Sequence, residues 1–219
     1  MPELDNDRRL ALSYIPAAAR QAVAALWRLD AALGAVLAGG REPLISQIKL
    51  AWWRDSLEKL DRERAPAEPA LLDASEHVLP RGVTGAELSR MEEGWAVLLT
   101  PEVLTSEELA HYAAARGGLL FRFTAVLLGG EGTPELEATG ESWALVDLAR
   151  HSGNEVDADS AILAARSRCG PRRWPSQLRP LGMLGALAQR DAEEGRPRWE
   201  PQGAPKRMLR MMRHRLTGR

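Results

Sequence analysis

The stretch from residue 41 to residue 60, "REPLISQIKLAWWRDSLEKL", decides the fold class of this chain. Pro43 stands where the first turn of a helix accepts proline. Ile45, Ile48 and Trp52 then follow at three- and four-residue steps, which is the spacing of one helix face. The stretch therefore predicts an amphipathic helix that buries its Ile45, Ile48 and Trp52 side.

Helical patterns of the same kind fill most of the chain on both sides of this stretch. Ala and Leu dominate the composition while Val and Ile are sparse, which favours helices over sheet. Thr84 and Glu87 have the spacing of a capping box, and Arg54 and Glu58 that of an i,i+4 ion pair. Besides 41–60, the predicted helices are 7–38 with a break at Pro16, 70–79, 84–99, 106–128, 134–152, 156–168, 178–195 and 204–216.

These segments predict an all-α protein: one helical domain over residues 1–219, in which 204–219 forms a basic C-terminal helix. The length of 219 residues and the 45% share of hydrophobic residues suit one packed body. The formal net charge of -1 gives no support for nucleic acid as a partner, because phosphate binding normally shows as a broad basic excess. Any basic patch must therefore be local.

The redox and targeting features of the sequence indicate a cytoplasmic protein. Cys169 is the single cysteine, so no intrachain disulfide can form, and we interpret it as an inert thiol in a reducing compartment. The first ten residues are acidic and then basic, unlike a secretory signal. Charged residues break the most apolar tracts before they reach the roughly 18 residues of a spanning helix, which predicts a soluble or peripheral protein.

Several stretches in order resemble landmarks of the squalene and phytoene synthase family. They are "YIPAAARQAVAALWRLDAALGAV", "REPLISQIKLAWWRDSLEKLD", "YAAARGGLLFRFTAVLLG", "RPLGMLGALAQRD" and "APKRMLRMMRHRLTGR". The resemblance implies an all-helical isoprenoid synthase fold. Active members join two prenyl diphosphates head to head, and magnesium ions there bridge the diphosphates to two DxxxD motifs on facing helices. Ionising a diphosphate requires cationic charge around its oxygens, so the chemistry needs both motifs.

The first motif falls on Asp30 by this resemblance, and it is incomplete. The position four residues later, where a second carboxylate would share the cation, is Gly34. Without a partner for the metal, Asp30 is better explained as a residue that caps its helix or pairs with Arg28 or Arg41. The sequence therefore predicts no metal site here.

The second motif should fall in the helix that contains Asp147, and it is incomplete too. The residue four positions after Asp147 is His151, while Asp157 and Asp159 come after Gly153, where we expect the helix to have ended. His151 could act as an acid or base near neutral pH, but a single histidine near a helix end is more often a hydrogen-bonded surface group. Asp30, Asp147 and His151 are thus candidates from degenerate motifs.

Bulky aromatic residues and small residues suggest how the helices pack. Trp27, Trp52, Trp53, Trp95 and Trp143 are best explained as core residues, and alternatively as residues that line or fill the channel where an active relative holds its prenyl chains. The small residues near 117 leave room for a second helix or for a ligand chain. The candidate pocket-lining residues are Trp52, Gly117, Gly118 and Phe121.

The C-terminal helix combines basic and apolar residues in a way that suits an anionic membrane surface. Met208, Leu209, Met212 and Leu216 lie among the basic positions, and each basic residue near such a surface adds about 1 kcal/mol. The alternative is a docked terminal helix with a solvated basic face. The membrane-contact candidates are Lys206, Arg207, Arg210, Arg213 and Arg215.

The incomplete motifs lead to three hypotheses about function. The first is a non-catalytic interaction, assembly or lipid-associated protein, similar to the mitochondrial complex I assembly factor branch of the family, with a protein partner or a lipid or isoprenoid ligand and no cofactor. The second is an active prenyltransferase that regroups its aspartates around Mg²⁺. The third is an isoprenoid carrier that keeps an apolar cavity without the chemistry.

Overall fold

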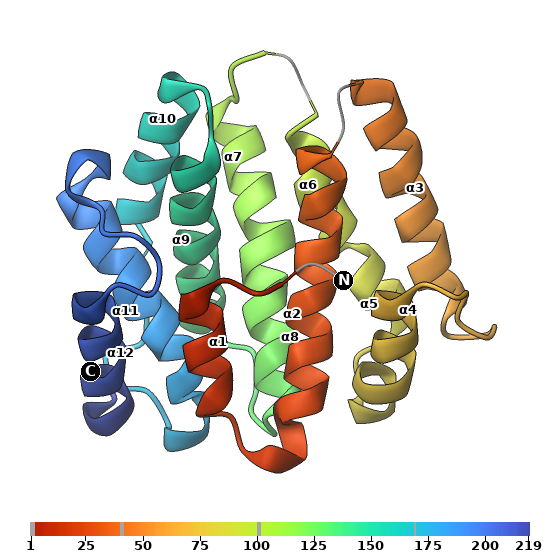
Figure 1. The fold of residues 1–219 in the computed structure, drawn as a ribbon, viewed down its shortest axis with the longest axis horizontal. Coiled ribbons are helices and arrows are strands. Elements are labelled where there is room, and N and C mark those ends of the chain that lie inside the picture. Colours follow the sequence, from red (N-terminus) through yellow and green to blue (C-terminus); the bar gives the residue numbers. More distant parts are fainter. Residues whose placement is uncertain (1–2, 40–41, 100–101, 169) are drawn as a thin grey trace.

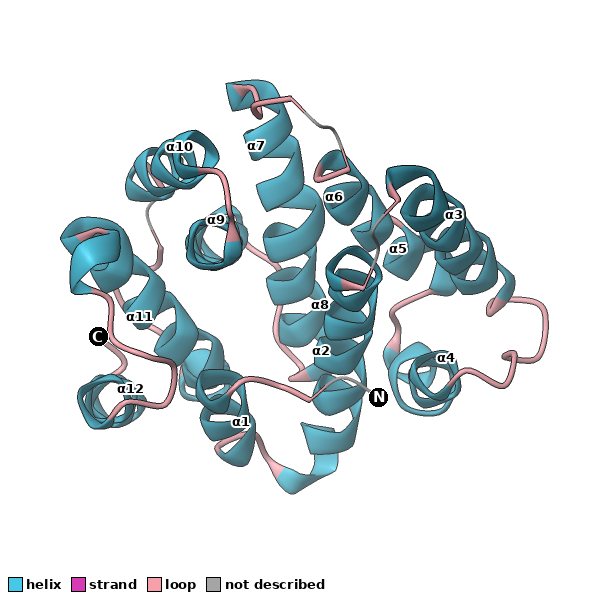
Figure 2. Ribbon diagram, turned by 45° about the horizontal axis from the view of Figure 1, so that its top comes forward, coloured by secondary structure: helices cyan, strands magenta, loops and turns pink. Residues whose placement is uncertain are grey.

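The computed structural model describes residues 3–39, 42–99, 102–168 and 170–219. Within these residues every regular element is helical, which confirms the all-α prediction (Figures 1 and 2). Gly40, predicted to end a helix, lies outside the described residues. The main helices are α1 (Asn6–Ser13), α2 (Ala17–Ala38), α3 (Pro43–Lys59), α4 (Pro69–Asp73), α5 (Gly85–Ser89), α6 (Met91–Val97), α7 (Ser106–Tyr112), α8 (Leu119–Leu127), α9 (Pro134–His151), α10 (Glu155–Arg166), α11 (Arg179–Glu194) and α12 (Pro205–Thr217).

Shorter helical segments complete the fold. Two are π-helical, η1 (Ala74–Val78) after α4 and η3 (Ala113–Gly118) between α7 and α8. Three are single 3₁₀ turns, η2 (Leu79–Arg81), η4 (Ser176–Leu178) and η5 (Arg196–Arg198). Because η3 continues α7 directly into α8, these three elements form one long helix with a local widening at its centre.

Capping residues set several of the helix ends as the sequence predicts. The Thr84 side chain accepts a hydrogen bond from the Glu87 N–H and the Glu87 carboxylate accepts one from the Thr84 N–H, so the predicted capping box is confirmed. Thr105 and Glu108 form a second such box at the start of α7. Pro43 occupies the first turn of α3, as expected. Each capping box satisfies two backbone donors that would otherwise lack partners.

The predicted helix 84–99 is two helices, α5 and α6, separated at Arg90. The Asp61 carboxylate accepts hydrogen bonds from the backbone N–H groups of Gly85 and Ala86, at 2.6 and 2.9 Å, and so fixes the start of α5 at the end of α3. α6 then packs against η3. This contact between segments distant in the sequence redirects the chain, and local spacing alone does not encode it.

α2 and the long helix α7–η3–α8 lie at the centre of the molecule (Figures 1 and 2). α9, α10, α11 and α12 follow on one side, and α3 to α6 on the other. α2 is, among the described helices, the one long and apolar enough to cross a membrane by length and composition, and 61% of its most apolar stretch is buried in the fold. Its hydrophobic surface is therefore largely used for packing against other helices.

The small residues of η3 serve a contact between helices. Gly117 faces Gly140 of α9, and a Cβ atom added to either glycine would overlap the backbone of the other. Phe121 is fully buried and lies 6.1 Å from Trp143 between ring centroids. The nearest side chain to Gly118 is that of Glu141. Of the two alternatives for this face, the structure shows the second helix, so the assignment of Gly117, Gly118 and Phe121 to a ligand pocket is corrected.

α3 buries the opposite face from the one predicted. Ile45, Ile48 and Trp52 are 44%, 63% and 45% exposed. The buried apolar side chains of the helix are instead Leu50, Trp53 and Leu57. Both faces carry apolar residues at helical spacing, so periodicity could not choose between them. Small Ser46 and Ser56 are on the buried face, where they allow a close approach.

The exposed face of α3 changes two further assignments. Trp52 is not a core residue and does not line an internal pocket, although Trp27, Trp53, Trp95 and Trp143 are buried as predicted. Arg54 pairs with Glu92 of α6, with 3.8 Å between Nη1 and Oε2, rather than with Glu58. Leu44, Ile45, Ile48 and Trp52 together leave an apolar stripe on the surface.

Candidate functional site

The carboxylate of Asp30 is fully buried near the middle of α2 and is held by three side chains. Arg116 Nε lies 3.0 Å from Oδ1 and Arg116 Nη2 lies 3.3 Å from Oδ2. Arg8 Nη1 lies 3.1 Å from Oδ2, and the Trp95 indole N–H donates to Oδ1 at 3.2 Å. Asp30 is therefore a component of a buried ion-pair network rather than a solvated helix residue.

The predicted partners of Asp30 are not the ones observed. Arg28 extends toward Asp73, with 3.7 Å between Nη1 and Oδ2, and is partly exposed. Arg41, the other predicted partner, lies outside the described residues. The two arginines that do reach Asp30 come from α1 and η3, which are 22 and 86 positions away in the sequence.

Arg116 joins Asp30 to Asp147, the candidate residue of the second motif. Its Nη1 lies 2.8 Å from Asp147 Oδ2 and also donates to the Tyr112 hydroxyl. Arg116 is buried and is carried by η3, the π-helical part of the central helix. The two aspartates thus converge, as the active-prenyltransferase alternative requires, but they converge on one guanidinium group.

Aromatic rings enclose this guanidinium. The Arg116 Cζ atom lies 4.0 Å from the ring centroid of Trp95 and 5.0 Å from that of Trp143. Such contacts contribute about 0.5 to 2 kcal/mol each, more when water is excluded. Trp95 and Trp143 therefore have two functions here, because they pack in the core and also stabilise the buried cation.

Trp95 also fills the space that a second aspartate of the first motif would need. A Cβ atom added to Gly34 would lie 2.7 Å from Trp95 Cη2 and 3.0 Å from Cζ2, which is too close for any side chain. An aspartate at position 34 could fit only if this indole moved. Gly34 and Trp95 are thus a matched pair, and the glycine is required by the packing.

Comparison with known proteins assigns the chain to a family. Residues 1–169 match the family model described as Squalene/phytoene synthase, which is more than half of the chain. The chain belongs to the squalene/phytoene synthase family. No curated protein matches it, and no solved structure matches it. The matched region includes Asp30, Arg116 and Asp147, whereas α11 and α12 lie after it.

Electrostatics keep the site of this squalene/phytoene synthase family member ionised. Burial alone would raise the pKa of Asp147, but Arg116 and a hydrogen bond from His151 outweigh it and hold that pKa well below its usual range. Burial would likewise lower the pKa of Arg116, yet its aspartate neighbours raise it above the usual value. Asp147 and Arg116 therefore face each other as opposite charges at pH 7, and Arg8 is shared between Asp30 and Asp5.

His151 borders this network at its exposed edge. Its Nδ1 lies 3.4 Å from Asp147 Oδ1, and its hydrogen bond with Asp147 raises the pKa of His151 despite partial burial.

Asp157 is not part of this network. Its carboxylate accepts a hydrogen bond from the Leu104 N–H at 2.8 Å, just before α7. Asp159 is exposed on α10. Of these four aspartates, only Asp30 and Asp147 lie close enough to the network for the hypothesis that an active enzyme regroups its aspartates around Mg²⁺.

The donor set does not fit magnesium. Mg²⁺ needs carboxylate oxygens that face open space in near-octahedral geometry, whereas the oxygens of Asp30 and Asp147 already accept from Arg8, Arg116 and Trp95. Among the described residues no group of three His, Cys, Asp or Glu side chains is placed to hold a metal ion. The Asp30 and Asp147 carboxylates therefore have the contacts of ion-pair partners and not those of metal ligands.

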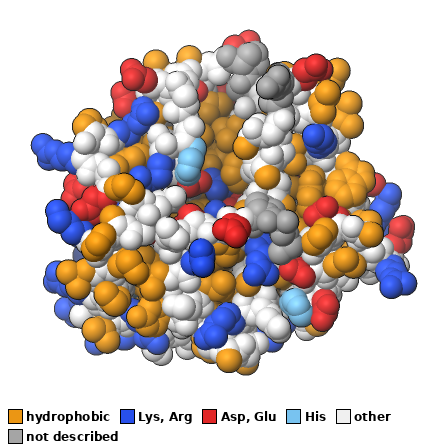
Figure 3. Space-filling view, viewed as in Figure 1, with side chains coloured by type: hydrophobic (Ala, Val, Ile, Leu, Met, Phe, Trp, Pro, Cys, Tyr) orange, Lys and Arg blue, Asp and Glu red, His pale blue; other side chains and the backbone are white. Residues whose placement is uncertain are grey.

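The surface near the site is hollowed. In Figure 3 a depression opens beside α9 on the face seen in Figure 1, and hydrophobic side chains lie within it. α9 and α2 run along its two sides, with the central helix between them. This face of the molecule therefore carries an apolar depression.

A second buried network joins α1, α11 and α12. Arg207 Nη2 lies 2.8 Å from Asp7 Oδ2, and its Nη1 lies 2.6 Å from Asp191 Oδ2. Arg150 of α9 adds a further contact of 2.8 Å to Asp191. Arg207 is 4% exposed. It cannot reach a membrane surface, and its assignment as a membrane contact is corrected.

The sequence contained one signal for Arg116 that motif reasoning missed. Arg116 stands between "YAAA" and "GGLLF" in an otherwise apolar helix, and a single arginine in such a place is expected to pair with a buried carboxylate. Arg8 had no comparable signal, because it lies in the charged run "DNDRRL". Only the fold of α1 across α2 reveals that it points inward.

Proposed function

We propose that this chain is a non-catalytic member of the squalene/phytoene synthase family, which acts by binding a protein partner or a lipid and does not condense prenyl diphosphates. The observation that carries the proposal is Arg116, whose guanidinium lies between Asp30 and Asp147. The resemblance to the complex I assembly factor branch supports the same interpretation. The incomplete motifs and the position of Arg116 both argue against a metal site at these aspartates.

The energetics oppose a simple exchange of Arg116 for a metal ion. Removing one partner from a buried ion pair costs about 3 to 5 kcal/mol, and a metal ion at Asp30 would have to displace Arg116 and Arg8 as well as the Trp95 N–H. The family's two DxxxD motifs supply four aspartates, and this chain retains the first of each. Two neutralised carboxylates leave little charge to hold a metal–diphosphate complex.

An activity assay tests the proposal. Purified protein incubated with farnesyl or geranylgeranyl diphosphate and Mg²⁺ is expected to yield no head-to-head product above a no-enzyme control, with an active family member assayed in parallel. The active-prenyltransferase alternative predicts the opposite. Product that disappears in the Asp30→Asn variant, while the variant keeps a cooperative melting curve, would sink the proposal.

A second function, the holding of an apolar ligand, is favoured by the hydrophobic hollow in Figure 3. Concave apolar surfaces with a few polar groups are typical ligand sites. The same incubation tests it when the protein is recovered and any retained prenyl compound is quantified. Retention without turnover supports a carrier, whereas neither retention nor turnover leaves an interaction protein as the function.

The outer face of α12 supports a peripheral contact with an anionic membrane on the cytoplasmic side. Lys206, Arg210 and Arg213 are exposed, and so are Leu209 and Leu216 between them. Arg215 is partly buried, with its Cζ 5.8 Å from the ring centroid of Tyr14. Three exposed cations and a few apolar side chains suit weak binding that depends on charge.

Cosedimentation with liposomes tests this contact. We expect weak binding to anionic liposomes, little to neutral ones, and release at about 0.5 M salt, where the Debye length falls well below its physiological 8 Å. Lys206→Glu combined with Leu209→Asp should abolish binding, and Arg62→Glu combined with Arg64→Gln, which changes the charge by the same amount in the loop after α3, is the matched control. Equal loss in both double variants would instead indicate attraction by overall charge.

A further inference from the structure

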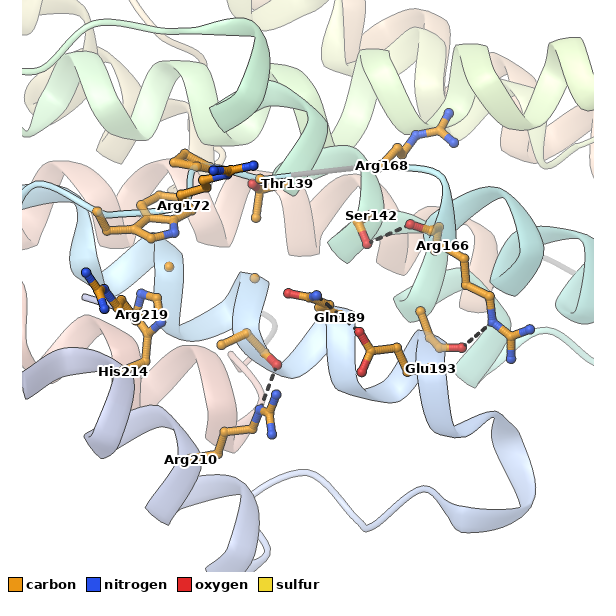
Figure 4. Close-up of a pocket in the computed structure, with 18 of the residues that line it drawn as sticks. Thr139, Ser142, Arg166, Arg168, Arg172, Gln189, Glu193, Arg210, His214 and Arg219 are labelled. Carbon is orange, nitrogen blue, oxygen red and sulfur yellow. Dashed lines mark hydrogen bonds between the residues drawn. The ribbon is translucent and has the colours of Figure 1, made fainter. Parts of the chain in front are cut away.

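A basic pocket of about 540 Å³ lies between α11, α12, the end of α10 and the segment 170–174 (Figure 4). It is on a different part of α9 from the Asp30 network, because Thr139 and Ser142 line it whereas Asp147 does not. Six arginines line this pocket against one glutamate, Glu193, although the chain as a whole carries a net charge of -1. The local basic patch that the sequence allowed is found here.

Most of these arginines have no acidic partner. Arg168 pairs with Glu141 at 2.7 Å and points away from the others in Figure 4. Among the described residues, no carboxylate pairs with Arg166, Arg172, Arg210 or Arg213. These guanidinium groups without acidic partners would attract an anion into the pocket.

Two of the arginines are positioned by backbone groups of α11. Arg166 Nε donates to the Ala192 carbonyl at 2.6 Å, and Arg210 Nε donates to the Ala186 carbonyl at 3.0 Å. Each contact uses the inner nitrogen and leaves the two terminal nitrogens for a ligand. Arginine binds phosphate oxygens through such pairs of N–H donors, and a fixed guanidinium loses less entropy when it does so.

His214 is a second, independent indication of a ligand. It lines the same pocket, is 4% exposed, and neither of its ring nitrogens has a side-chain hydrogen-bond partner among the described residues. A buried polar group without a partner costs about 1 to 3 kcal/mol. Burial lowers the pKa of His214 to about 4, assisted by Arg179 and Arg210 and opposed by a backbone contact with Arg219. The ring is therefore neutral at pH 7 and carries one N–H.

We propose that this pocket binds an anion that carries a phosphate or diphosphate group. Arg172, Arg210 and His214 would contact the phosphate oxygens, and Arg166 and Arg213 would add positive charge at the rim of the pocket. The inference goes beyond the proposed function and does not depend on it, because the family match ends at residue 169 and most of the pocket is formed after that residue.

Two sources could supply this group, a soluble phosphate compound or the headgroup of a lipid. The exposed Leu209, Met212 and Leu216 lie on the same helix as Arg210 and Arg213, so a lipid headgroup could enter from a membrane surface. Both sources share the phosphate chemistry, and the experiment below separates them.

Calorimetric titration with pyrophosphate tests the soluble source. We expect saturable binding that sulfate at equal ionic strength does not match. Arg172→Gln combined with Arg210→Gln should weaken it about tenfold or more, as expected for the loss of charge-assisted hydrogen bonds. Both side chains are exposed, so the double variant should fold. Arg62→Gln combined with Arg64→Gln removes the same charge from the loop after α3 and should change affinity less than twofold.

The ring signals of the four histidines in NMR spectra of the wild-type protein provide a second readout. Pyrophosphate should shift the His214 signal, which His214→Gln identifies, and leave His77 and His111 unchanged.

For the lipid source, vesicles that contain phosphatidic acid should bind and be displaced by pyrophosphate, and the Arg172/Arg210 variant should lose this binding. Binding of either probe that depends on these residues supports the proposal. It is overturned if neither probe binds, or if the control variant loses affinity equally.

Discussion

Replacing Arg116 with methionine is expected to lower the free energy of unfolding by about 3 to 5 kcal/mol at pH 7. Methionine keeps most of the volume of the side chain but removes the charge that faces Asp30 and Asp147. Arg8 would still contact Asp30, whereas Asp147 would retain only His151 at its exposed edge. The cost therefore comes from buried carboxylates without a counter-charge.

The deficit of this variant should shrink as the pH falls. In the native protein the pKa of Asp147 is lowered, so its stabilising contribution is complete above the unfolded value of about 3.9 and is lost as the pH falls through the folded value. Without Arg116, burial raises that pKa instead. Protonation then removes the unpaired charge, so the difference from wild type should be smaller at pH 5 than at pH 7.

Urea denaturation at both pH values measures this effect. Arg28→Met is the matched control, because it breaks a partly exposed pair with Asp73 and should cost about 0 to 1 kcal/mol. Equal stability of the two variants would show that Arg116 is not balanced by the buried aspartates, and the central argument for lost catalysis would fail with it.

Trp53→Ala is expected to cost about 3 to 5 kcal/mol, while the same change at its neighbour Trp52 should cost far less. Trp53 is 7% exposed and packs in the core, so its removal leaves a cavity. Trp52 lies on the exposed stripe of α3 and contacts Trp53 edge to face, with ring centroids 5.4 Å apart. Loss of that pair contributes about 0.5 to 1.5 kcal/mol.

Thermal melting of the two variants compares the faces of α3 directly. The neighbouring tryptophans have identical chemistry and the same helical context, so a difference between them reports burial alone. If Trp52→Ala proved to be the more destabilising change, the face predicted from sequence periodicity would be the buried one after all, and the orientation of α3 described above would be wrong.

Local sequence signals predicted the helices well and their orientation less well. The capping box at Thr84 and the proline at position 43 act within one turn, so they could be read without the fold. The buried face of α3 could not, because Leu50, Trp53 and Leu57 are as apolar as Ile45, Ile48 and Trp52. Only the neighbouring helices decide between two such faces.

The sequence predicted only part of the candidate site, because the rest depends on contacts between helices. The family resemblance located Asp30 and Asp147, and the structure brings them to one guanidinium group. Arg8 depends on the path of α1, which no local pattern specifies, whereas Arg116 had a local signal that motif reasoning did not use. Motif reasoning therefore identified the acidic half of the network and missed the basic half.

The adjacent residues Asp7 and Arg8 reach into two different networks, and this affects how the protein is made. Arg8 pairs with Asp30, whereas Asp7 pairs with Arg207, which follows it by 200 positions. During synthesis α1 can settle on α2 early, but Asp7 stays unpaired until α12 has left the ribosome. Completion of the fold is thus a late event, and a protease that removes α1 would also loosen the opposite end of the chain.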